Sequence, residues 1–257
     1  MISINRISAL KNQPWEVTLQ GDIFDWDNMN FKEFEELFKS GAKEITLKED
    51  VVFEAGEKET YENGIEINEK GLIINGNGHA IDGKAQVSLL YIKAEVTLKN
   101  ILFKNAYCEY SGGAIFNDAD LKIENCGFCN NSSDEFGGAV YNKCYSRLTI
   151  INSGFRKNRA DYGGAIFNDS NSLANLDGAV FKSNSSEFEG GAIYNKSKLS
   201  VYGTLFYGNA SFKGGSIYNE GMLNIRDCNF EKNIASEGND IKNQNENNLN
   251  IHNCSFH

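Results

Sequence analysis

The chain of 257 residues contains one proline, three histidines and no long apolar run. The single proline, Pro14, argues against a proline-rich linker. No stretch of about 18 consecutive apolar residues occurs, so we expect no membrane insertion. Basic residues are also in deficit, with 25 Lys and Arg against 35 Asp and Glu and a formal charge of −10. This balance argues against nucleic acid as a partner.

The amino terminus lacks the features of a secretory leader. Residues Met1–Arg6 contain no apolar segment and no small-residue cleavage site. The sequence therefore leaves two expectations open. The chain is either cytoplasmic or a piece of a longer secreted protein.

Glycine, in contrast, is abundant, with 25 residues. Many of them belong to one repeated motif, in which Gly-Gly is followed by Ala or Ser, an aliphatic residue, an aromatic residue and Asn. Copies begin at Gly112, Gly137, Gly163, Gly190 and Gly214, and a degenerate copy begins at Gly238. Successive copies are 24 to 27 residues apart. Such a period is typical of stacked repeats rather than of a conventional globular domain.

A second signature accompanies the first. Each repeat carries a short alternating apolar segment followed by Phe, such as Leu121, Ile123 and Phe128, and in five repeats Asn follows three residues after the Phe. Those residues are Asn131, Asn158, Asn184, Asn209 and Asn233. Short alternating segments separated by Gly, Asn, Asp and Ser indicate strands and turns. With three short strands per repeat, the sequence predicts a parallel β-helix of about nine coils.

In such a helix, equivalent residues of successive coils stack about 4.8 Å apart. The aliphatic and Phe columns are then expected to form the core. The Asn columns are expected to hydrogen-bond to one another and to turn backbone, forming an asparagine ladder. The glycines supply the backbone angles and close approach that sharp turns require.

The first part of the chain is predicted to cap this array. Asn30-Phe31-Lys32-Glu33 has the pattern of a capping box and begins a short amphipathic helix that ends near Gly41. We expect residues 1–43 to form a cap and residues 44–257 the β-helix, together one structural domain. Strand-like segments are predicted at Glu44–Leu47, Gly64–Ile67, Leu72–Ile74 and Tyr91–Leu98. No cap is predicted after Phe256, which favours further repeats or end-to-end self-association there.

The paired motifs resemble the right-handed parallel β-helix repeats of adhesin-like surface proteins, including those of methanogenic archaea and the chlamydial polymorphic outer-membrane proteins. The segment 72–83, Leu-Ile-Ile-Asn-Gly-Asn-Gly-His-Ala-Ile-Asp-Gly, is similar to a coil that these proteins share with pectin-degrading enzymes of the pectin lyase-like fold. The resemblance covers roughly residues 44–257. It implies a secreted or cell-surface location and a role in adhesion or carbohydrate binding.

The aromatic position of the motif is the first candidate binding site. If the aliphatic residue before it points inward, alternation turns the aromatic residue outward. The resulting ladder contains Phe116, Tyr141, Phe167, Tyr194 and Tyr218, and a second column contains Phe136, Tyr162, Phe188 and Phe212. An exposed ladder could stack on sugar rings or contact a protein. Alternatively, the rings stack on one another and are partly buried in the wall.

Acidic residues just before the Gly-Gly turn are the second candidate site. Glu135, Asp161 and Glu187 recur at steps of 26 and are expected to stack as a column of like charges. Calcium would relieve their repulsion and is the one cofactor that the sequence suggests. The alternative is that these acids point into solvent without a metal.

Catalytic residues are not predicted. A pectin-type hydrolase would need paired carboxylates, and neither Gly-His-Gly nor Arg-x-Lys occurs in the chain. His79 has no partner that the sequence reveals. Cys126, Cys228 and Cys254 occupy a small-residue position two residues before the repeat Phe, where buried thiols are expected, with Cys228 and Cys254 on adjacent coils. Cys108 and Cys144 are predicted in turns.

These patterns favour a non-enzymatic surface or adhesion module that binds glycan or protein through its side wall. The alternative is a lyase or glycoside hydrolase acting on an acidic, pectin-type polysaccharide.

Overall fold

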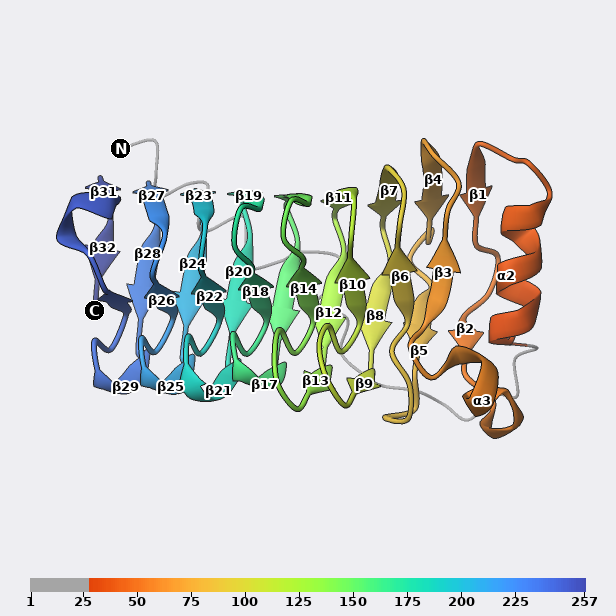
Figure 1. The fold of residues 1–257 in the computed structure, drawn as a ribbon, viewed down its shortest axis with the longest axis horizontal. Coiled ribbons are helices and arrows are strands. Elements are labelled where there is room, and N and C mark those ends of the chain that lie inside the picture. The colour runs from red at the N-terminus through yellow and green to blue at the C-terminus, as the bar shows by residue number, and fades with distance from the viewer. Residues whose placement is uncertain (1–27) are drawn as a thin grey trace.

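The protein is described by a computed structural model that covers residues 28–257. The chain winds into coils that stack along one long axis, and every strand pairing is parallel. Four sheets run along this axis, as Figure 1 shows. The predicted parallel β-helix of about nine coils is confirmed, since two of the sheets contain nine strands each.

The first sheet contains, in spatial order, β1 (Glu44–Thr46), β4 (Leu72–Asn75), β7 (Val96–Lys99), β11 (Asp120–Glu124), β15 (Arg147–Ile151), β19 (Leu173–Asp177), β23 (Lys198–Tyr202), β27 (Met222–Arg226) and β31 (Leu249–His252). The second sheet contains β3 (Ile65–Ile67), β6 (Leu90–Ile92), β10 (Ile115–Asn117), β14 (Val140–Asn142), β18 (Ile166–Asn168), β22 (Ile193–Asn195), β26 (Ile217–Asn219) and β30 (Ile241–Asn243).

The third sheet contains β2 (Val51–Val52), β5 (Ala80–Asp82), β8 (Leu102–Lys104), β12 (Gly127–Cys129), β16 (Gly154–Arg156), β20 (Val180–Lys182), β24 (Leu205–Tyr207), β28 (Asn229–Glu231) and β32 (Ser255–Phe256). The fourth sheet is shorter and contains β9 (Tyr107–Cys108), β13 (Ser132–Ser133), β17 (Arg159–Tyr162), β21 (Ser185–Glu189), β25 (Ala210–Lys213) and β29 (Ile234–Glu237).

The fourth sheet corrects the prediction of three strands per coil. It begins at Tyr107, so the earlier coils have three strands and the later ones have four. Cys108 consequently lies in strand β9 rather than in a turn, whereas Cys144 does lie in a turn. The segment predicted as one strand over Tyr91–Leu98 is two strands, β6 and β7, which belong to different sheets.

The core is built from the predicted columns. The aliphatic residues of the Gly-Gly motif, from Ile115 to Ile217, are fully buried. The repeat Phe residues form a continuous stack in which neighbouring ring centroids lie 4.6 to 5.1 Å apart. Members of this stack are Phe103, Phe128, Phe155, Phe181, Phe206, Phe230 and Phe256.

Two asparagine ladders satisfy the turns, as predicted. In the second sheet, each side-chain amide donates to the next Asn side chain at 2.6 to 2.8 Å, from Asn117 through Asn243. The other ladder runs from Asn131 to Asn233 at 2.9 to 3.0 Å. These bonds provide partners for polar groups that the coils bury.

The two glycines of each motif serve different purposes. Gly137 has a φ of 65°, in the left-handed region that glycine tolerates best. A Cβ atom on Gly138 would lie 2.3 Å from the carbonyl oxygen of Gly164 and 2.4 Å from that of Arg159. The second glycine is therefore required because backbone of the next coil fills the space.

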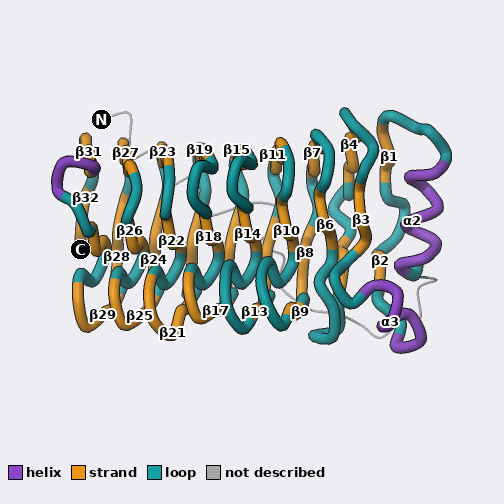
Figure 2. Tube along the Cα trace, in the orientation of Figure 1, coloured by secondary structure: helices purple, strands orange, loops and turns teal. Residues whose placement is uncertain are grey.

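One end of the array is covered by helix α2 (Phe31–Lys39), as Figure 2 shows in purple. The capping box is confirmed: the Asn30 side chain accepts from the Glu33 amide, and the Glu33 side chain accepts from the Asn30 amide, both at 2.9 Å. Phe31, Phe34 and Phe38 are buried against the first coil. The 3-10 helix η2 (Ala55–Glu57) and the short helix α3 (Lys58–Tyr61) follow strand β2 and were not predicted.

A second 3-10 helix, η3 (Glu246–Asn248), precedes β31 at the other end. Within residues 28–257, no helix has the length and apolarity needed to cross a membrane. The division into a cap at 1–43 and a β-helix at 44–257 stays a prediction, and residues 1–27 of that cap lie outside the described part of the chain.

Candidate functional site

The aromatic ladder forms one continuous column on the outside of the second sheet. Strand pairing places its rings side by side, with centroid separations of 4.8 to 5.6 Å. The ladder also includes Tyr91, which pairs with Phe116 at 5.1 Å and which sequence reasoning missed. Tyr91 lies before the first Gly-Gly motif, so the motif search could not find it.

Much of the ladder is buried, which corrects the expectation of an exposed platform. Phe167, Tyr194 and Tyr218 are 2%, 4% and 2% exposed, and Phe116 and Tyr141 are partly buried. The second aromatic column covers them: the Phe136 ring lies 4.7 Å from Phe167. The alternative interpretation, in which the rings stack on one another, describes this part of the wall. A role in ligand binding stays a prediction for the ladder.

The phenol groups of the ladder are tied to acids of neighbouring turns. The Tyr141 hydroxyl donates to Asp169 at 2.7 Å, and the Tyr194 hydroxyl donates to Glu220 at 2.8 Å. Burial, followed by these hydrogen bonds, raises the pKa of both phenols. The buried rings are therefore held in fixed orientations and act as structural elements of the wall.

Asp161 and Glu187 of the acidic column lie in β17 and β21 of the fourth sheet, and Glu135 lies in the bend after β13. Glu135 and Glu187 are exposed and Asp161 is partly buried. Burial raises the pKa of Asp161, and the charges of Glu187 and Asp134 raise it further. The like-charge repulsion expected from the sequence thus acts on Asp161. In the described part of the chain, no three His, Cys, Asp or Glu side chains are grouped as a metal site, and calcium stays a prediction.

A further candidate site is a concave surface on the outer face of the first sheet. It is a groove of about 620 Å³ that crosses β15, β19, β23, β27 and β31. Strand alternation buries residues such as Ile150 and turns Thr149 and Ile151 outward. The groove follows the long axis of the β-helix because the same positions of successive strands line it.

Two outward columns form the groove. The central column is polar and uncharged and contains Thr149, Asn175, Ser200, Asn224 and Asn250. The lateral column contains Ile151, Asp177, Tyr202, Arg226 and His252. Hydroxyl and amide groups thus form one column, beside a column of aliphatic, aromatic and charged residues. Sequence reasoning missed the groove because its residue types differ from coil to coil and only strand register brings them together.

Charges at the groove are partly paired. The Arg226 Nε atom lies 3.3 Å from an oxygen of Asp227, while the Asn250 amide donates to the Asn224 side chain at 2.8 Å. The central column therefore presents hydrogen-bonding groups to solvent, and charges of one sign are not concentrated beside it.

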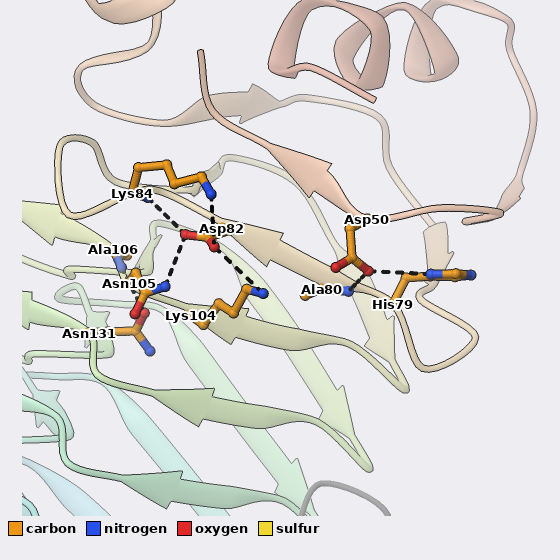
Figure 3. A network of polar contacts seen from close by, with 9 residues as sticks. All are labelled: Asp50, His79, Ala80, Asp82, Lys84, Lys104, Asn105, Ala106 and Asn131. Carbon is orange, nitrogen blue, oxygen red and sulfur yellow. Dashed lines mark hydrogen bonds and ion pairs between the residues drawn. The ribbon is translucent and has the colours of Figure 1, made fainter. Parts of the chain in front are cut away.

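Near the capped end, His79 does have a partner, Asp50, which sequence reasoning missed. Its Nδ1 atom lies 3.3 Å from Asp50 Oδ1, and the same oxygen accepts from the Ala80 amide at 2.9 Å (Figure 3). Asp82, only 5% exposed, accepts from Asn105 at 3.1 Å and lies 3.5 Å from the Lys104 ammonium group. Both acids join neighbouring coils through these contacts, which indicates a structural role.

The six cysteines are free thiols. Cys126 and Cys228 are buried in the small-residue position, as predicted, whereas Cys254 is partly exposed. A hydrogen bond with Cys228 lowers the pKa of the Cys254 thiol to about 7. This contact agrees with the predicted placement of these two residues on adjacent coils.

Two segments of the chain, residues 128–143 and 178–196, match the Chlamydia polymorphic membrane protein repeat. Each matched segment ends in a Gly-Gly motif and its second-sheet strand, β14 or β22. The resemblance to an adhesin-like β-helix repeat protein is thereby confirmed. No curated protein and no solved structure matches the chain.

Proposed function

We propose that the protein is an adhesion-type module of a cell surface that binds an extended glycan in the groove of the first sheet. The two segments that match the Chlamydia polymorphic membrane protein repeat support the surface setting and the adhesin class. The observation that supports a glycan ligand is the polar central column of the groove. Its hydroxyl and amide side chains recur once per coil.

The spacing of this column suits a polysaccharide. Stacked strands are about 4.8 Å apart, and an extended glycan advances by a similar distance per sugar. Each coil could therefore present one polar group to one sugar, with Ile151 and Tyr202 beside it as apolar surface. Such a site combines many weak hydrogen bonds, each contributing roughly 0.5–1.5 kcal/mol. Affinity would then grow with the length of the bound glycan.

A glycan array with the whole chain tests this proposal. The triple variant Asn175→Ala, Ser200→Ala, Asn224→Ala removes three central groups that point outward, so the fold should be retained. We expect the affinity for the glycan selected by the wild type to fall about tenfold or more. The control variant Arg156→Ala, Lys182→Ala alters two exposed residues of the third sheet and should bind normally.

Three outcomes would contradict the proposal. Unchanged binding by the triple variant would exclude the groove, and failure of the wild type to bind any glycan while binding a host-surface protein would favour a protein ligand. Cleavage of an acidic polysaccharide, seen as unsaturated products or new reducing ends, would favour the enzymatic alternative.

A further inference from the structure

A smaller pocket lies between the second and fourth sheets, where the fourth sheet begins. Its volume is about 200 Å³, and it is lined by Asn63, Ser88, Tyr91, Cys108, Tyr110, Ser111 and Phe116. Tyr91, Cys108 and Phe116 come from β6, β9 and β10, and the other four residues lie outside the named strands. The groove of the first sheet shares none of these residues, so the pocket is a separate site.

The pocket exists because one ring of the second aromatic column is missing. Strand bridges align Ser111 with Phe136 and Tyr162 on the two following coils. Phe136 and Tyr162 cover the ladder, with ring centroids 4.7 Å from Phe167 and 5.8 Å from Tyr194, respectively. Ser111 is too small to cover the ladder in the same way. The first rings, Tyr91 and Phe116, therefore line an open pocket instead of a packed wall.

The lining combines aromatic surface with a few polar groups. Tyr91 and Phe116 meet edge to face at 5.1 Å, and Tyr110 is 59% exposed beside them. Asn63 and Ser111 add an amide and a hydroxyl group at the same pocket. Aromatic faces with adjacent hydrogen-bonding groups suit an amphipathic ring, such as the face of a pyranose with its hydroxyl groups.

The size of the pocket and the charges around it restrict the class of ligand further. Drug-sized ligands occupy pockets of roughly 300 Å³ or more, so a pocket of about 200 Å³ holds one ring. The nearby cations are paired: Lys93 lies 2.7 Å from Glu66, and Lys143 lies 2.6 Å from Asp118. Glu62 and Glu109, which precede the lining residues Asn63 and Tyr110 in the chain, add negative charge, and this favours a neutral ligand over an anionic one.

We propose that this pocket binds a single neutral sugar ring, as the terminal or branch residue of a glycan. The ring would stack on the aromatic lining in the position that an aromatic side chain fills in the next coil. This site goes beyond the groove and does not depend on it.

The proposal is tested with neutral methyl glycosides of common hexoses and N-acetylhexosamines by saturation-transfer difference NMR. The wild-type chain should bind at least one of them at millimolar concentration. Ser111→Phe restores the missing ring of the second column and should weaken this binding at least tenfold, with the melting temperature unchanged or raised. Tyr110→Ala removes the exposed ring and should also weaken binding, whether or not Ser111→Phe folds normally.

Two controls make the result specific. Tyr145→Ala removes a ring that is 80% exposed in another turn, and it should bind the glycoside like the wild type. The groove variant Asn175→Ala, Ser200→Ala, Asn224→Ala should also retain glycoside binding, so failure of the groove and failure of the pocket are distinguishable. Absence of any glycoside signal, wild-type binding by Ser111→Phe and Tyr110→Ala, or binding of N-acetyltryptophanamide in place of the sugars would overturn the proposal.

Discussion

At the scale of single residues, buried asparagines connect one coil to the next. Asn168 is fully buried, and its side chain makes four hydrogen bonds. The amide donates to the Asn195 side chain and the Lys198 carbonyl, and the oxygen accepts from Asn142 and Ser172. Each bond satisfies a group that would otherwise be buried without a partner, so the ladder should contribute strongly to stability.

Replacing Asn168 with Ala should therefore lower the free energy of unfolding by about 3 kcal/mol, since several buried polar groups lose a partner. Urea denaturation followed by circular dichroism measures the change. Asn250→Ala is the matched control: Asn250 is exposed and, among residues 28–257, its side chain hydrogen-bonds only to Asn224, so the loss should stay below about 0.5 kcal/mol. Equal losses of unfolding free energy in the two variants would show that the buried ladder contributes no more to stability than an exposed asparagine pair.

At the scale of the strand, the fourth sheet contains an acidic residue, Asp161, whose ionised form is destabilised in the folded state. The pKa of Asp161 is raised above its ordinary value by burial and by Glu187 and Asp134. The folded state therefore binds this proton more tightly than the unfolded state, and stability is lost as pH rises through the unfolded pKa of about 3.9. Above the folded pKa the loss is complete.

Asp161→Asn should consequently stabilise the protein at pH 7, by less than about 1 kcal/mol because the site is only partly buried. The gain should vanish below about pH 4, where the wild-type carboxyl is protonated. If calcium binds the acidic column, it should raise the melting temperature of the wild type, and EGTA should reverse the rise. A calcium effect of the same size in Asp161→Asn would place the ion elsewhere, and a gain that persists at pH 3 would contradict the electrostatic explanation.

The strands also show what the sequence could and could not predict. The aliphatic, Phe and Asn columns were predictable because each repeats one residue type at one position, and the capping box at Asn30 has a fixed spacing. The fourth strand was not, because segments such as Ser132–Ser133 are too short and too polar to alternate. The break within Tyr91–Leu98 was missed because no Gly or Pro marks it.

The sites were harder to predict than the strands. Outward orientation of the aromatic ladder followed from alternation, but its burial depends on Tyr162 of the fourth sheet and on Phe136, which pairs with Tyr162 through an isolated bridge. The pocket depends on Ser111, a position where the aromatic pattern fails rather than repeats. The pocket of this β-helix thus lies where a residue departs from the repeat, whereas the fold depends on the residues that repeat in every coil.

At the scale of the whole molecule, stability should vary along the axis. In a repeat array each coil contacts only its neighbours, so local opening starts where neighbours are few. Helix α2 covers the first coil with Phe31, Phe34 and Phe38. At the opposite end of the described chain, Ile251 and Phe256 are exposed, and β31 pairs on one side only.

Amide hydrogen exchange should therefore be fastest in β29 to β32 and slowest in the central coils around β15 and β16, where Leu148 and Phe155 are fully buried. Asn168→Ala should lower protection chiefly in β14, β18 and β22, because its lost bonds connect those strands, and should leave β5 near the cap almost unchanged. Mass spectrometry of peptic fragments resolves these regions. Uniform protection along the axis, or a uniform loss in the variant, would instead mean that the coils unfold as one cooperative unit. A graded change in protection along the axis is expected if each coil is stabilised only by its contacts with the adjacent coils.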